Sequence, residues 1–251
     1  MVSKTIDQGS IPCVPVRQRR ADKTAVRGLI LLFPTQMDDL IQTLIQENYL
    51  KTPLIIEAFR KIKRKDFVLE NLKKDADINM PLTIGYGQTI SQPLTVAFML
   101  ELLQPNPGEK ILDIGSGSGW QAALLAYCVA APQERGEPRQ EGGGKVIAVE
   151  RIPELVEFSK QNMTKYNFIK KGVIKIICGD GSRGLEKESP FDKIIAAANA
   201  EEIPEAWKKQ LKINGRIVAP IKNSIWLFIK KSENKFSEQE FPGFVFVPLV
   251  L

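Results

Sequence analysis

Apolar residues recur every three or four positions from residue 38 onward, as Leu40, Leu44 and Ile45 show. This spacing predicts an amphipathic helix, because such positions share one helical face. A second helix is predicted after Thr52, which suits an N-cap and precedes a proline. The elements predicted in this first part are helices from residue 38, over 53–62 and over 93–103, polar loop with short helix over 63–79, and an extended, glycine-punctuated segment over 80–93.

Beyond residue 105, short apolar runs alternate with longer helical patterns. This alternation predicts an α/β fold with a doubly wound, mostly parallel sheet that is covered on both faces. No helical pattern separates the last two runs, so they are predicted to form an antiparallel C-terminal hairpin. The predicted strands are 110–114, 145–150, 173–178, 192–197, 216–220, 224–230 and 244–249, and the predicted helices are 120–130, 153–166 and 204–211.

The first 36 residues show no sustained periodicity and contain six Lys or Arg against two Asp. They carry most of the formal charge of +6, and the rest of the chain is nearly neutral. This distribution favours a disordered basic leader over a nucleic-acid-binding arm. We expect a leader over residues 1–36 and one domain over 37–251, with N-terminal helices in 37–104 and the sheet in 105–251. Prolines and three consecutive glycines predict a surface loop over 131–144.

Composition excludes several kinds of site. The 251 residues include no histidine, which removes His-based triads, His metal sites and imidazole acid–base chemistry. Cys13, Cys128 and Cys178 are too far apart for a metal site or a disulfide framework. No apolar run reaches the roughly 18–20 residues of a membrane span. We therefore expect a cytoplasmic protein without a metal or a membrane partner, and a monomer because nothing indicates a coiled coil.

Residues 111–119 read Ile-Leu-Asp-Ile-Gly-Ser-Gly-Ser-Gly, a buried strand followed by a glycine-rich turn that opens a helix. Gly115, Gly117 and Gly119 allow close approach of a ligand to the backbone, and the helix start presents free N–H groups. A nicotinamide-dinucleotide turn follows a different spacing, G-x-G-x-x-G. Asp113 inside the motif would repel a pyrophosphate but suits the cationic amino-acid and sulfonium end of S-adenosylmethionine.

Acidic residues also end the next two predicted strands. Glu150 is placed to accept hydrogen bonds from both ribose hydroxyls, and Asp180 could meet the adenine amino group. Because parallel strands end at one edge of a sheet, Asp113, Glu150 and Asp180 should converge on one crevice. Each acid alone is equally compatible with a helix cap or a solvated loop. Together with the glycine turn, they favour binding of S-adenosylmethionine.

Residues 82–93 read Leu-Thr-Ile-Gly-Tyr-Gly-Gln-Thr-Ile-Ser-Gln-Pro and closely resemble the signature of the protein-L-isoaspartate O-methyltransferase family. The resemblance runs from about residue 38 to the end and implies a Rossmann-like class I methyltransferase fold with an N-terminal helical portion. It is weaker at residues 196–199, Ala-Ala-Ala-Asn, where many relatives carry a hydroxyl residue and a proline. Further segments that resemble family motifs are 64–68, 111–119, 149–152, 179–181, 190–195, 215–220 and 246–249.

The resemblance implies a reaction and a set of site residues. The reaction is methyl transfer from S-adenosylmethionine to the free carboxylate of isoaspartyl residues in damaged proteins and peptides, after which the ester collapses to a succinimide. Ser91 is implied as the active-site hydroxyl, with Thr89 shaping the substrate channel. The segment that includes Gln88, Ile90 and Gln92 is expected to bind substrate main chain. The cofactor motifs of the resemblance add Ser116, Arg151 and Gly181 to the glycines and acids given above.

This chemistry suits a chain without histidine. A carboxylate, with an unperturbed pKa of roughly 4, is already ionised at neutral pH and needs no general base. The protein must instead align the reacting atoms and exclude water. Ser91 could orient the carboxylate, although an N-cap for the helix at residue 93 is the alternative role.

Other functions stay open at this level. The first alternative is a methyltransferase that acts on RNA or a small-molecule carboxylate. The second is a non-catalytic adaptor, and the third is a nicotinamide-dependent oxidoreductase. Amino-directed nucleic-acid enzymes carry an Asn/Asp-Pro-Pro-aromatic motif after the fourth strand, where this chain has Ala-Ala-Ala-Asn.

Overall fold

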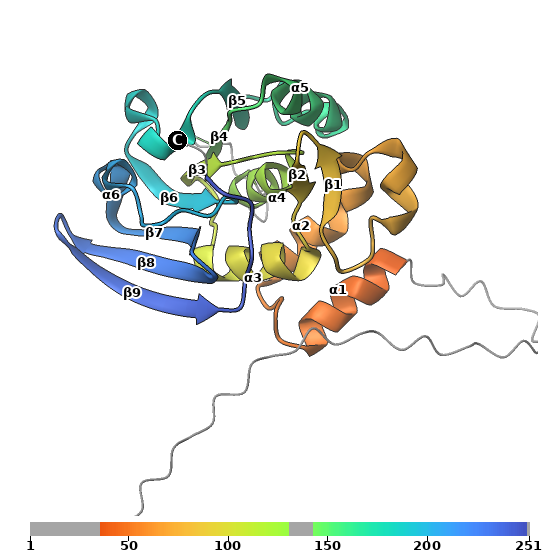
Figure 1. The fold of residues 1–251 in the computed structure, drawn as a ribbon, viewed down its shortest axis with the longest axis horizontal. Coiled ribbons are helices and arrows are strands. Elements are labelled where there is room, and N and C mark those ends of the chain that lie inside the picture. Colours follow the sequence, from red (N-terminus) through yellow and green to blue (C-terminus); the bar gives the residue numbers. More distant parts are fainter. Residues whose placement is uncertain (1–35, 131–142, 250–251) are drawn as a thin grey trace, which may run out of the picture.

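The computed structural model describes residues 36–130 and 143–249 (Figure 1). The predicted leader, apart from its last residue, and most of the predicted 131–144 loop lie outside these ranges. The N-terminal portion begins with α1 (Gln36–Gln46) and α2 (Pro53–Lys61), which match the predicted helices. The polar stretch after α2 forms the 3₁₀ helices η1 (Arg64–Phe67) and η2 (Glu70–Asp75).

Seven strands form the main sheet, in the order β5-β4-β3-β6-β7-β8-β9. Neighbours from β5 to β7 pair in parallel, whereas β7, β8 and β9 pair antiparallel. The chain moves outward from β3 to β5 and then returns to β6 beside β3, so the winding reverses between β3 and β6. Open α/β sheets bind ligands at such a reversal. The strands are β3 (Lys110–Ile114), β4 (Lys145–Glu150), β5 (Ile174–Cys178), β6 (Phe191–Ala196), β7 (Leu211–Ile221), β8 (Ser224–Ser232) and β9 (Lys235–Pro242).

The predicted strand over residues 244–249 is wrong. The partner of β8 in the C-terminal hairpin is β9, whose residues are mostly polar and exposed because β9 is the outer edge of the sheet. Residues 244–249 instead run across the ends of the strands, drawn in dark blue in Figure 1. Asn199 N–H donates to the Val247 carbonyl at 2.8 Å, and Leu249 N–H donates to the Asn199 carbonyl at 2.7 Å.

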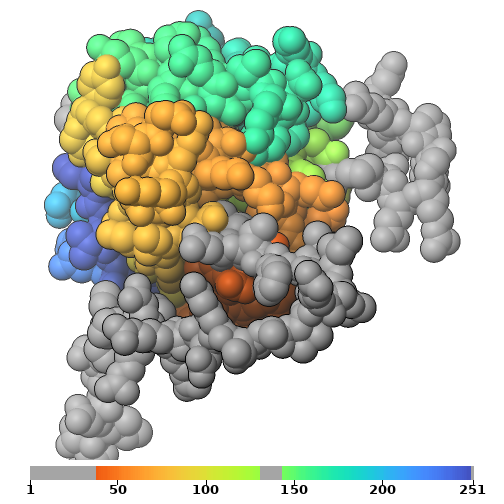
Figure 2. Space-filling view, turned by 90° about the vertical axis from the view of Figure 1, so that its right-hand side faces the viewer, coloured from red at the N-terminus to blue at the C-terminus, as the bar shows by residue number. Residues whose placement is uncertain are grey.

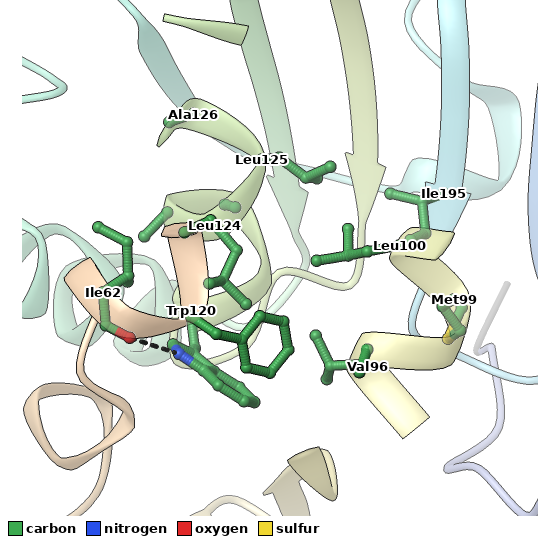
Figure 3. Close-up of a cluster of buried hydrophobic side chains, with 14 of the residues drawn as sticks. Ile62, Val96, Met99, Leu100, Trp120, Leu124, Leu125, Ala126 and Ile195 are labelled. Atoms are coloured by element: carbon green, nitrogen blue, oxygen red, sulfur yellow. Dashed lines mark hydrogen bonds between the residues drawn. The ribbon is translucent and has the colours of Figure 1, made fainter. Parts of the chain in front are cut away.

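The helices cover both faces of the sheet through two hydrophobic clusters. In β3, Ile111 belongs to the first cluster while Leu112 and Ile114 belong to the second, because successive strand residues point to opposite faces. Figure 3 shows part of the first cluster, in which Trp120 packs between Ile62, Val96 and neighbouring leucines. The remaining helices are α3 (Pro93–Leu103), α4 (Trp120–Val129), α5 (Pro153–Asn162), which continues as η3 (Thr164–Tyr166), and α6 (Glu205–Gln210).

The glycine-punctuated segment forms a small hairpin of its own. Strands β1 (Leu82–Gly85) and β2 (Gln88–Ile90) pair antiparallel, and Tyr86 in their turn has a φ of 54° between two glycines with positive φ. Met80 lies just before the hairpin and is 45% exposed. A side chain placed before a surface hairpin has no second layer to cover it.

The N-terminal portion packs against the sheet domain beside α5. Tyr166 donates a hydrogen bond from its hydroxyl to Asp66 Oδ2 at 2.6 Å and accepts one from Lys63 N–H at 3.0 Å. Figure 2 shows this side of the molecule, where the orange and gold residues of the N-terminal portion adjoin the green residues of the sheet domain. No helix within the described ranges combines the length and apolar character needed to cross a membrane.

Candidate functional site

A cavity of about 410 Å³ lies at the carboxyl ends of the parallel strands. Its walls come from β2 and the residue after it, the starts of α3 and α4, the glycine turn after β3, the end of β4, the turns after β5 and β6, and the C-terminal segment. The cavity is large enough for a small-molecule cofactor, since such sites enclose roughly 300–1,000 Å³. The fold therefore brings together the signature segment, the glycine turn and the C-terminal segment, which the sequence motifs had identified separately.

The glycine turn forms one wall. Gly115, Gly117 and Gly119 have φ values of 77°, 50° and 87°, which side chains rarely tolerate, and α4 begins directly after Gly119. A Cβ on Gly119 would overlap the Ser159 hydroxyl and lie 2.5 Å from Met163 Cε. Gly119 is therefore required where α4 packs on α5, while Gly115 and Gly117 line the cavity itself.

Glu150 lies where the prediction put it, on the cavity wall at the end of β4. The side chain is 6% exposed. Its Oε2 accepts from Gly117 N–H at 2.9 Å, and its Oε1 accepts from Ile152 N–H at 3.0 Å. Each carboxylate oxygen keeps a second acceptor position. Glu150 thus holds the glycine turn in place and can still accept hydrogen bonds from a ligand.

Asp113 lies behind the cavity wall rather than on it. The carboxylate is fully buried, and its Oδ1 accepts from Gln121 Nε2 at 2.8 Å. Its Oδ2 has no hydrogen-bond partner among the described residues. The pKa of Asp113 is raised to about 7, chiefly by burial and also by the nearby charge of Glu150, whereas the Gln121 hydrogen bond acts to lower it. Gln121 lines the cavity, so Asp113 is linked to a ligand site through a residue that the motif had not identified.

The remaining predicted cofactor residues lie around the cavity. Ser116 lines it, and its buried Oγ has no partner within the described part of the chain. Asp180 is exposed, and hydrogen bonds from the Ser182 side chain and from the Ser182 backbone N–H, which lies 2.8 Å from Asp180 Oδ1, lower the Asp180 pKa. Gly181 is buried, and a Cβ there would lie 2.5 Å from Ile114 Cγ2. Arg151 is exposed and contributes to the same wall.

The substrate segment meets this cavity from the other side. Gln88, Thr89, Ile90 and Ser91 all line it, whereas Gln92 does not. Gln92 is the N-cap residue of α3, so the alternative reading of Ser91 as that N-cap is wrong.

The C-terminal segment supplies a wall that strand prediction had missed. Val247, Pro248 and Leu249 line the cavity. Residues 196–199, where the chain differs from many relatives, adjoin this segment. Asn199 forms both of the backbone hydrogen bonds described above, with Val247 and Leu249. The signal that pointed here was the family resemblance of residues 246–249, since the apolar run alone indicated a strand.

Comparison with known proteins agrees with this arrangement. The family model for protein-L-isoaspartate(D-aspartate) O-methyltransferase matches residues 35–251. The protein-L-isoaspartate O-methyltransferase of Methanopyrus kandleri is 37% identical over 223 residues, 87% of this chain and 93% of that protein. The Hyperthermus butylicus protein of the same name is 38% identical over 215 residues, 84% of this chain and 87% of its own.

Solved structures give the same result. The chain is similar to the crystal structure of a beta-aspartate methyltransferase from Plasmodium falciparum in complex with S-adenosyl-L-homocysteine. The TM-score is 0.73 and the identity 25%, and the match covers 84% of this chain and 97% of that one. A second structure, of a protein-L-isoaspartate O-methyltransferase, matches with a TM-score of 0.71 and 26% identity over 84% of this chain and 65% of that one.

Proposed function

The chain belongs to the protein-L-isoaspartate(D-aspartate) O-methyltransferase family, and on that premise we propose that it methylates the free carboxylate of isoaspartyl residues in damaged proteins and peptides. The observation that carries this proposal is the meeting of two motifs in one cavity. Thr89 and Ser91 line the same space as Gly117 and Glu150, although the two pairs are far apart in the sequence. The glycine turn with Glu150 and the signature segment thus line one cavity.

The residues around the cavity fit S-adenosylmethionine. A buried hydroxyl without a partner, such as Ser116 Oγ, is uncommon in a folded protein and indicates a ligand or water as its partner. Glu150 offers free acceptor positions beside it, and Asp180 adds a second acid at the rim. Bound there, S-adenosylmethionine supplies a methyl group on a positively charged sulfonium. Gly115, Gly117, Gly181 and Arg151 complete the proposed binding set.

The chain's own residues then have to bind, orient and desolvate the substrate. We assign the Ser91 hydroxyl to orienting the substrate carboxylate by a hydrogen bond, with Thr89 shaping the entrance to the cavity. No proton has to be removed from a carboxylate that is ionised at neutral pH. Positioning of the reacting groups can account for roughly 7–11 kcal/mol of the barrier. The absence of histidine from the sequence is compatible with such a mechanism.

The decisive experiment is methyl transfer from labelled S-adenosylmethionine to an isoaspartyl peptide, beside the same peptide with normal aspartate. We expect base-labile label on the isoaspartyl peptide alone, with the rate reduced in Ser91→Ala while affinity for S-adenosylhomocysteine is kept. If S-adenosylhomocysteine binds but neither peptide is labelled, the substrate assignment is wrong. The same enzyme should then be assayed with RNA and with small-molecule carboxylates.

We further propose that residues 37–251 act as one methyltransferase domain. The first hydrophobic cluster supports this, because it runs without interruption from Leu40 in α1 to Leu227 in β8. The monomeric state and the cytoplasmic location remain predictions from the sequence. The nearly neutral charge of the chain outside its first 36 residues argues against nucleic acid as the main partner.

A further inference from the structure

Arg64 is a fully buried cation that lies outside the cavity wall. It comes from η1, between α2 and the hairpin of β1 and β2. Its guanidinium donates hydrogen bonds to main-chain carbonyls. Nη1 donates to Ala76 O at 2.8 Å, and Nη2 donates to Met80 O at 2.8 Å and to Ser91 O at 3.1 Å.

The acceptors of Arg64 lie on both sides of the hairpin. Ala76 and Met80 precede β1, whereas Ser91 follows β2. One planar side chain therefore joins the entry and the exit of the hairpin and holds the main chain of the proposed catalytic serine. A second tie lies nearby, where Leu94 in the first turn of α3 donates its N–H to Asn79 Oδ1 at 3.0 Å.

The same guanidinium reaches the cofactor side of the site. Its Cζ lies 5.5 Å from the centre of the Trp120 ring, a distance at which a cation and an aromatic face attract each other. Trp120 follows the glycine turn directly and lines the cavity. Its Nε1 donates to Ile62 O at 3.4 Å, which Figure 3 draws as a dashed line. Arg64 thus contacts both halves of the site without touching the cavity.

Stability alone does not explain a cation in this place. A buried charge is expensive to desolvate, and an apolar side chain of similar size is often at least as stable. Burial lowers the pKa of Arg64 to about 10, more than nearby Asp77 raises it, so the guanidinium stays charged at neutral pH. Its rigid, planar fork of donors fixes the carbonyls on both sides of the hairpin in one geometry, which the compact ammonium of lysine on its flexible stem does not impose. The gain is a defined geometry of the hairpin relative to the glycine turn.

We propose that Arg64 is a positioning residue for methyl transfer, which sets where Ser91 lies relative to the glycine turn by clamping both ends of the hairpin. The inference rests on the proposed function for its kinetic consequence, but its structural part stands on the contacts of Arg64. On this proposal, Arg64→Lys keeps the positive charge but loses the hydrogen bonds that join the two ends of the hairpin.

The kinetic test compares Arg64→Lys with the control Lys230→Met. Lys230 is as buried as Arg64 and also donates to main-chain carbonyls, those of Lys208 and Leu211, but it lies in β8 away from the cavity. We expect Arg64→Lys to lower kcat/KM for an isoaspartyl peptide by about 10- to 100-fold, because small misplacements of reacting groups have effects of this order. Affinity for S-adenosylhomocysteine should stay within about threefold of the starting protein, because Glu150 and the glycine turn are intact. Lys230→Met should leave both quantities near their original values, because the hydrogen-bond partners of Lys230 lie outside the cavity wall.

Hydrogen–deuterium exchange supplies a readout that does not need the reaction. Arg64→Lys should speed the exchange of amides in residues 82–92 and leave exchange in β7 and β8 unchanged. Lys230→Met should speed exchange in β7 and β8 and leave residues 82–92 unchanged. If Arg64→Lys leaves both kcat/KM and exchange in residues 82–92 unaltered, the proposal is wrong. Parallel loss of S-adenosylhomocysteine binding and activity would also overturn it, because the residue would then serve general folding. If the starting protein methylates no isoaspartyl peptide, the proposed function fails, and exchange alone decides the role of Arg64.

Discussion

Gly119 allows the packing of the cofactor turn to be tested with a matched control. Gly119→Ala places a methyl group at a φ of 87°, against the Ser159 hydroxyl and 2.5 Å from Met163 Cε. Gly108→Ala places the same methyl group at a φ of 83°, with no atom within 4 Å among the described residues. Both variants carry the backbone strain, and only Gly119→Ala carries the overlap.

The two contributions can be separated by magnitude. A left-handed alanine costs about 1–2 kcal/mol, and overpacking of a close-packed interface costs about 1–3 kcal/mol. Gly108→Ala should therefore lower the free energy of unfolding by about 1–2 kcal/mol, and Gly119→Ala by about 2–5 kcal/mol. Urea denaturation measures both. Because α4 must shift away from α5, Gly119→Ala should also weaken S-adenosylhomocysteine binding, which Gly108→Ala should leave unchanged.

A second substitution checks the cause. Ser159 Oγ is buried and has no hydrogen-bond partner among the described residues, so its removal leaves no donor or acceptor unpaired. Ser159→Ala in the Gly119→Ala background should recover part of the lost stability and affinity, since the remaining overlap is with the flexible end of Met163. Equal destabilisation in Gly119→Ala and Gly108→Ala, or no recovery in the double variant, would refute the packing argument.

Two further predictions concern the acids of the site. Glu150→Ala frees the glycine turn, which Glu150 holds through Gly117 N–H, and removes the carboxylate proposed to accept hydrogen bonds from the ligand. Because a hydrogen bond to a charged group contributes about 1.5–3 kcal/mol, calorimetry should show S-adenosylhomocysteine affinity falling at least about tenfold. Glu154→Ala, at an exposed position beside the site, should bind as before. Asp113 has a raised pKa of about 7, so the folded state holds a proton that the unfolded state releases, and stability should fall as pH rises from about 4 to about 7. Asp113→Asn should remove this fall, and an unchanged pH profile of the urea midpoint in that variant would show that Asp113 is not its source.

Local sequence signals were sufficient for the parallel part of the sheet. The apolar runs that became β3, β4 and β6 are buried on both faces, and such runs stand out in a single sequence. The glycine turn was also readable, because positive φ at Gly115, Gly117 and Gly119 restricts the residue type. Glu150 followed from its place at a strand end. In each case the cause lies within a few residues of the effect.

Contacts between distant segments decided the rest. Strand β9 is polar because it needs only backbone pairing with β8 on one edge, so periodicity could not identify it. The apolar run at residues 244–249 was mistaken for a strand, whereas its residues are half-buried or exposed and the last three line the cavity. Asp113 lies behind Gln121, which donates a hydrogen bond to it. Arg64 donates a hydrogen bond to the main chain of Ser91, which is 27 residues further along the chain. The sequence by itself determined the fold class, the cofactor turn and the reaction family, because these depend on local backbone geometry and motif chemistry. Only the tertiary structure decided which polar side chains face the cavity and which hold its walls, because that depends on which carbonyls and donors folding leaves to be paired.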